Sequence, residues 1–339
     1  MPLPAGKLPA DLLGKLLASV RPADPAVLVG PAIGEDAAVL DLGGTDLVVV
    51  KTDPITFATQ DMGRYLLAVN SNDLATMGAR PRWLLVTALL PEGIAGEDAE
   101  CLFESVRRAC EEADVALVGG HTEITVGLDR AILIGCLLGT VARERLVRTG
   151  GARVGDALVL AGGIAVEGSA ILAREHRQRL SARGIEPAVI ETVAAWLCEP
   201  GISILPAARA LHATGAVHAM HDPTEGGLVT ALHELAEAAG VGLRIEGDGI
   251  PVLPACRTIC EALELDPLGL LASGALVAAI DPAEVPAALD RLANRGIPAA
   301  RIGEIVPEQE GRTWRLGGQV QPLPRFARDE LARYLEGPG

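Results

Sequence analysis

Four aspartates stand where the chain is expected to leave a strand or to present one face of a helix. Asp36 lies in the glycine-rich turn of GPAIGEDAAVL, and Asp53 directly follows the strand-like segment VVVKT. Asp73 comes three residues after Asn70 in an expected helix, so both side chains project from one face. Asp222 follows the strand-like segment AVHAM. Converging carboxylates could hold Mg²⁺, which binds proteins through one or two carboxylates plus substrate phosphates, although a single aspartate after a strand is more often a turn former or a helix cap.

The motif GGHTE, residues 119 to 123, offers a second kind of chemistry. It follows a short segment, VALVGG, that we expect to be a buried strand, so a turn at Gly119 and Gly120 could aim backbone N–H groups at an anion. His121 and Glu123 are candidate catalytic residues, and His121 is equally well explained as an ordinary polar loop residue.

Alternating strand-like and helix-like segments must position these residues. In the first half they predict strands at 37–42, 46–52, 83–91, 115–120 and 130–142 and helices at 61–79 and 97–113. In the second half they predict strands at 157–161, 216–222, 275–280 and 299–305, two helices before residue 212, and helices at 227–240 and 283–295. This alternation predicts a mixed α/β protein. The glycine-rich connection GGARVGD places the domain boundary between residues 1–149 and 150–339.

Composition restricts the partners. The formal net charge of −15 argues against a nucleic acid or an anionic membrane, because both require a basic surface. The chain starts without a secretory signal pattern and has no apolar run of about 20 residues, so we expect a cytoplasmic protein that does not span a membrane. Its six scattered cysteines are typical of reduced thiols.

Five motifs together resemble one superfamily. GEDAAVL, KTDPITF, AVNSNDLATMGARP, VGGHTE and HDPTEGGLVTALHELA occur in the order found in aminoimidazole ribonucleotide synthetase-like (PurM-like) proteins, over about residues 30 to 307. That superfamily includes selenophosphate synthetase, thiamine-monophosphate kinase and the hydrogenase-maturation protein HypE. TDPITF, NDLATMGARP and HDPTEGGL are most similar to HypE.

The resemblance implies an architecture and a set of binding residues. It implies a homodimer whose N-terminal domains complete a β-barrel, a C-terminal α/β sandwich domain, and ATP held together with Mg²⁺. The implied metal ligands are Asp36, Asp53, Asp73 and Asp222. The implied nucleotide-binding residues are Asp53, Asn70, Asp73, Gly119, Gly120 and Thr122.

The chain departs from the HypE pattern in several places. HypE usually ends in a cysteine that carries the group it dehydrates, whereas this sequence ends RYLEGPG and its last cysteine is Cys260. It has AVEG where HypE tends to have GDHG, and LASGAL where HypE often has NEG. Instead of a glycine-rich N-terminal segment it has AGKLP, in which Lys7 either reaches a phosphate as a catalytic residue or is a solvated lysine.

Three functions remain open at this point. The leading hypothesis is an Mg²⁺- and ATP-dependent enzyme, similar to HypE, that activates or phosphorylates an oxygen of an unidentified small molecule or carrier protein. A kinase similar to thiamine-monophosphate kinase is the second, although ITFATQ replaces the VEGVHF-like segment usual in those enzymes. The third is a non-catalytic nucleotide-binding partner in a maturation complex.

Overall fold

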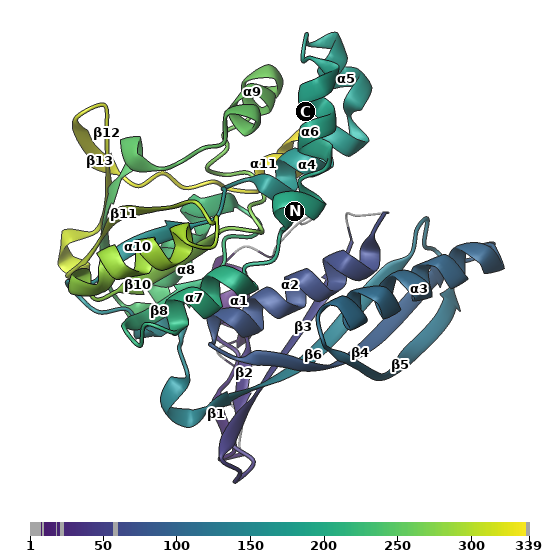
Figure 1. Ribbon diagram of the computed structural model, residues 1–339, viewed down its shortest axis with the longest axis horizontal. Helices are drawn as coiled ribbons and strands as arrows, with labels where there is room; N and C mark the ends of the chain where they lie inside the picture. Colours follow the sequence, from purple (N-terminus) through teal and green to yellow (C-terminus); the bar gives the residue numbers. More distant parts are fainter. Residues whose placement is uncertain (1–7, 9, 18, 21–23, 57–59, 337–339) are drawn as a thin grey trace. The chain divides into compact units, whose positions relative to one another are not determined.

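The computed structural model describes residues 8, 10–17, 19–20, 24–56 and 60–336 (Figure 1). These residues divide into two compact units. The N-unit comprises residues 24–30 and 36–146, and the C-unit comprises Pro31–Glu35, the chain from Val147 onward and the described part of the first 21 residues. The fold is mixed α/β, and each unit contains one sheet.

The described residues of the N-unit form a six-stranded sheet in the order β1-β2-β3-β6-β4-β5. Two long helices, α2 and α3, lie side by side on one face of it (Figure 1). The elements are β1 (Val27–Val29), β2 (Ala38–Leu40), β3 (Asp46–Ile55), α2 (Met62–Thr76), β4 (Arg80–Pro91), α3 (Gly96–Glu112), β5 (Ala116–Thr125), β6 (Ile132–Ala142) and a 3₁₀ turn (Arg143–Arg145).

Strand alternation explains which face the helices cover. Leu47 and Val49 of β3 and Leu137 of β6 are fully buried, and they point to the same side as α2. The neighbouring residues Val48 and Leu138 are only half-buried. The sheet therefore has one face packed under helices and one apolar face that no described helix of the N-unit covers.

The strand expected at residues 115–120 differs from the prediction in two ways. It is an exposed edge strand rather than a buried one, and it continues to Thr125 in parallel pairing with β4. GGHTE is consequently part of a strand, and the turn that we expected there is wrong. Gly120 is needed for a different reason, because a Cβ atom on it would lie 1.8 Å from the Val86 carbonyl oxygen.

The described residues of the C-unit form a seven-stranded sheet in the order β13-β12-β9-β11-β7-β10-β8. Its core lies between this sheet and α8, whose leucines are buried. The strands are β7 (Ala157–Ala161), β8 (Val217–His221), β9 (Gly242–Glu246), β10 (Leu276–Ile280), β11 (Ala299–Val306), β12 (Arg312–Leu316) and β13 (Gln319–Pro322). The α-helices are α1 (Ala10–Leu17), α4 (Val166–Glu175), α5 (Arg177–Ala182), α6 (Pro187–Ala194), α7 (Leu205–His212), α8 (Gly227–Ala239), α9 (Pro254–Leu263), α10 (Val285–Ala293) and α11 (Glu330–Leu335).

The segment between β7 and β8 holds more helices than the two that we expected. The structure has four there, α4 to α7, with a π-helical turn (Leu197–Gly201) before α7. Among the described residues no single helix is long and apolar enough to cross a bilayer, and one pair bent by 45°, Pro187–Ala194 with Leu197–His212, reaches that length and composition.

Candidate functional site

Two of the predicted metal ligands, Asp53 and Asp73, contact one lysine in the N-unit. The ammonium nitrogen of Lys51 lies 3.2 Å from Asp73 Oδ2 and 3.4 Å from Asp53 Oδ2. The carboxylate of Asp36 acts on the same ammonium group. Burial alone would lower the pKa of Lys51, but the carboxylates of Asp73, Asp53 and Asp36 outweigh it and hold this pKa above its usual value.

Regular secondary structure positions this acidic site. Lys51 and Asp53 are two residues apart on β3, so both side chains point to the face that α2 covers. Asp73 and Asn70 lie on one face of α2, as the sequence predicts, and both are buried. Asn70 ties the helix to the strand, because its Oδ1 accepts a hydrogen bond of 3.0 Å from the backbone N–H of Asp53. The absence of a side chain at Gly135 leaves room for the Asn70 amide.

A cavity of about 500 Å³ lies on the same face of the sheet. It is lined by apolar side chains of β4, β6 and α3 and by residues 119–122 of β5. Strand register connects it to the acidic site, since Asp53 pairs with Gly135 of β6 and Gly135 with Val86 of β4. Val86 lines the cavity and pairs with Gly120 of β5. Three strand spacings, about 14 Å, therefore separate Asp53 from Gly120. This distance is comparable to the length of an extended nucleoside triphosphate.

The two candidate catalytic residues of β5, His121 and Glu123, lie away from the acidic site. His121 borders the cavity together with Gly120, although strand alternation directs its side chain away from the face that Gly120 shares with Val86. His121 Nε2 lies 3.4 Å from Glu123 Oε2, and both side chains are exposed. Their catalytic role stays a prediction, at a place that the register separates from Asp53. Lys7 lies outside the described residues.

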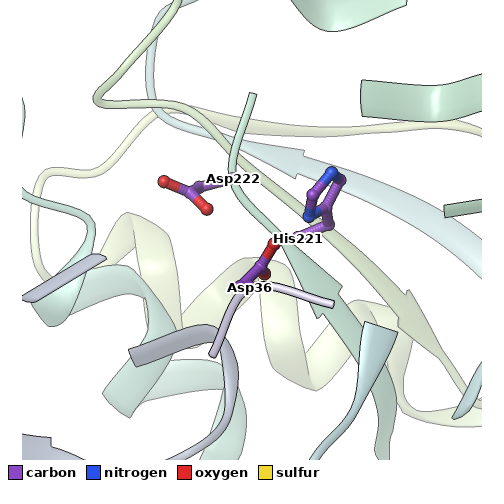
Figure 2. A group of neighbouring side chains, drawn as sticks. All are labelled: Asp36, His221 and Asp222. Atoms are coloured by element: carbon purple, nitrogen blue, oxygen red, sulfur yellow. The ribbon is translucent and has the colours of Figure 1, made fainter. Parts of the chain in front are cut away.

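Asp222 belongs to the C-unit, where it follows the last residue of β8. It is buried, and His221 beside it places Nε2 3.1 Å from Glu234 Oε2 of α8. Figure 2 shows the two side chains at the end of this strand; the third side chain labelled there, Asp36, belongs to the N-unit. His218, near the start of β8, instead places Nδ1 2.9 Å from Asp156 Oδ1.

A buried acid that the sequence analysis did not single out lies elsewhere in the C-unit. Glu167, in the first turn of α4, is only 7% exposed. The hydroxyl of Ser273 donates a hydrogen bond to its carboxylate, and Glu167 Oε2 has no hydrogen-bond partner among the described residues. Burial raises the pKa of Glu167 to about 7, and the nearby carboxylates of Asp329, Glu225 and Asp222 add to this rise. An acidic residue within the apolar segment AGGIAVEGSAIL is the signal that could have identified it.

The motifs of the two halves match one protein family along most of the chain. Residues 34–141 match the N-terminal domain of AIR synthase related proteins, and residues 153–315 match the C-terminal domain of the same family. The predicted resemblance to this family is thereby confirmed.

Individual relatives match this chain over most of its length. The carbamoyl dehydratase HypE of Cupriavidus necator is 32% identical over 90% of this chain and 84% of its own length. HypE of Rhodobacter capsulatus is 33% identical over 91% of this chain and 88% of its own length. A crystal structure of hydrogenase maturation protein HypE in complex with ATP superposes with a TM-score of 0.72 at 25% identity, covering 97% of this chain and 98% of the other.

Proposed function

Because the chain belongs to the family of AIR synthase related proteins, we propose that it is an Mg²⁺- and ATP-dependent enzyme of the HypE type. It activates or phosphorylates an oxygen atom of a small molecule or carrier protein. The observation that supports this most is the contact of Asp53 and Asp73 with one cation, the Lys51 ammonium, whose pKa the carboxylate of Asp36 also raises. Carboxylate oxygens are the ligands that Mg²⁺ prefers, and here the ammonium stands in for it, so the residues fit the ion.

In this proposal the acidic site binds the metal, and the apolar cavity on the same face of the sheet binds the nucleoside part of ATP. Asp53, Asp73 and Asp36 hold the metal, and Asn70 fixes the end of β3 against α2 so that Asp53 stays in place. The apolar cavity, bordered by Gly119, Gly120 and Thr122, takes the nucleoside part of ATP. When bound, Mg²⁺ orients and neutralises the phosphates, which is most of what phosphoryl transfer requires of a protein.

ATP affinity measured with and without the metal tests the proposal. By isothermal titration calorimetry we expect ATP to bind at least about 100-fold more weakly in EDTA than in Mg²⁺, since without the ion the phosphates meet three carboxylates. A circular dichroism spectrum in EDTA checks that the fold is unchanged. Equal affinity under both conditions would contradict the metal site.

Turnover separates the enzyme from a non-catalytic nucleotide-binding partner. An enzyme releases ADP when supplied with its acceptor, so candidate acceptors that include thiamine monophosphate are screened for ADP release. Tight ATP binding with no turnover by any acceptor, together with co-purification of another protein, would favour the partner.

We also propose that the helix-free face of the N-unit sheet is covered by a second copy of the chain. Leu85 of β4 lies on this face with 39% of its surface exposed, beside half-buried apolar residues of β3 and β6. The edge strand β5 leaves backbone groups available for pairing. An apolar face of this kind next to an open edge is typical of a dimer interface.

Replacing Leu85 by aspartate is therefore expected to convert a homodimer into monomers at micromolar concentration, because it buries a charge in an apolar interface. Light scattering coupled to size-exclusion chromatography measures the mass. Leu316→Asp is the matched control, since Leu316 lies on strand β12 of the C-unit and is 40% exposed. A wild-type monomer, or a Leu85→Asp dimer, would contradict the interface.

A further inference from the structure

The acidic site contains a cation that belongs to the protein itself, the ammonium group of Lys51. Lys51 is one of only three lysines, and the other two, Lys7 and Lys15, are near the N-terminus. Its side chain is 23% exposed, and it lies within ion-pair distance of both Asp53 and Asp73.

The ammonium and a divalent ion compete for the same oxygen atoms. Asp53 Oδ2 and Asp73 Oδ2 are the atoms that contact Lys51 Nζ, and a metal held between these two carboxylates would draw on the same pair of groups. Two cations sharing them would repel each other by several kcal/mol at an effective dielectric constant of about 20. A metal that enters alone must therefore displace Lys51 without offering the ammonium another anion.

A nucleotide changes this balance, because its phosphates provide new anionic partners. A lysine ammonium is a point charge on a flexible four-carbon stem, so it can turn from a carboxylate to a phosphate without movement of the backbone. The strand carrying Lys51 is paired with β6 on both sides of this residue, so only the side chain needs to move.

We propose that Lys51 is a built-in counter-cation that occupies the metal position until a nucleotide arrives, so that divalent metal and nucleotide enter the site together. This inference rests on the proposed function and adds a regulatory residue to it. Lys51 is a positioning residue here: it couples the two ligands, and by linkage each raises the affinity of the other by the same factor.

Mn²⁺ binding to the nucleotide-free protein tests the inference without any activity measurement. Calorimetry or electron paramagnetic resonance should show that Lys51→Met binds Mn²⁺ alone at least about tenfold more tightly than the wild type, because the competing charge is gone. Lys51→Arg keeps the charge and should keep the weak binding. Lys15→Met removes an exposed lysine from α1 and should change nothing. Equal Mn²⁺ affinities for Lys51→Met and the wild type would overturn the inference.

A second measurement uses the wild-type chain, in case Lys51→Met does not fold. An amine-reactive reagent followed by mass spectrometry reports the reactivity of Lys51, with Lys15 as internal standard. We expect the reactivity of Lys51 to change on adding Mn²⁺ with a non-hydrolysable ATP analogue, and to stay constant with Mn²⁺ alone at the same concentration. An equal change with Mn²⁺ alone would show that the metal displaces Lys51 unaided and would overturn the inference.

The proposed function and this inference fail in different ways. A wild-type protein that binds no Mn²⁺–nucleotide complex contradicts the proposed function, and with it the role of Lys51. A wild-type protein that binds the complex, while Lys51→Met binds Mn²⁺ alone no better than the wild type, contradicts the role of Lys51 only.

Discussion

Replacing Asp53 by asparagine is expected to weaken Mg²⁺-dependent ATP binding at least about 100-fold. Mutation of residues that only hydrogen-bond to metal ligands already lowers metal affinity by about 10- to 100-fold, and Asp53 is proposed to be a ligand itself. Asparagine has nearly the same shape but no negative charge, so it neither attracts the metal nor compensates Lys51. The fold should persist, since Asn70 bonds to the backbone of Asp53 and not to its carboxylate. Titration calorimetry with Mg²⁺–ATP measures the loss.

Asp46→Asn is the matched control for this experiment. Asp46 opens the same strand, β3, and its side chain is exposed, so the variant removes one charge without touching the acidic site. Asp73→Asn should behave like Asp53→Asn, because Asp73 Oδ2 lies closest to Lys51 Nζ. If Asp53→Asn binds Mg²⁺–ATP as tightly as Asp46→Asn does, the metal is held elsewhere.

The residues that local periodicity positions could be predicted from the sequence. Asn70 and Asp73 share a helix face because they are three residues apart. Asp53, which was expected directly after a strand, lies within it, because β3 continues its alternation as far as Ile55. The same alternation places Lys51 beside Asp53. The local sequence does not show that Lys51 meets Asp73, because the two residues come together only through the packing of α2 on β3.

The turn expected at GGHTE was wrong because of tertiary structure that the local sequence does not reveal. Two consecutive glycines normally indicate a turn, and nothing in the local sequence indicates that β4 lies alongside. Parallel pairing with β4 holds residues 119–123 in a strand, and the close approach of the Val86 carbonyl makes Gly120 necessary. Parallel partners are separated in sequence by a whole helix, here α3, so the pairing could not be read locally.

The environment of Glu167 could be predicted from the sequence even less well. Glu167 begins α4, Glu225 precedes α8, Ser273 precedes β10, and Asp329 caps α11. Asp329 joins two of these segments, because its Oδ2 accepts a hydrogen bond of 2.6 Å from the backbone N–H of Gly226. Burial also raises the pKa of Asp329, to about 6. Four segments spread over the C-unit create the environment of one carboxyl group, so no single stretch of sequence reveals it.

Replacing Glu167 by glutamine is expected to stabilise the protein above pH 7 by about 3 kcal/mol and to have little effect near the ordinary pKa of a glutamate. The folded state raises this pKa from 4.5 to about 7, so between these values the unfolded chain ionises while the folded chain keeps its proton. The stability of the wild type therefore falls as pH rises through this window, and the loss is complete above the folded pKa. Glutamine cannot ionise and escapes the loss.

Calorimetric melting of the full chain at about pH 5.5 and about pH 8 measures the effect. We expect Glu167→Gln to raise the Tm of the transition that includes the C-unit, and this gain should grow with pH. Glu175→Gln is the matched control, because Glu175 ends the same helix and is exposed. A gain that is equal at both pH values would mean that Glu167 does not titrate in this window. Destabilisation at both would mean that its carboxylate is ionised and paired. The expected result leaves a buried acid that lowers stability at neutral pH, which is typical of a group retained for function rather than for folding.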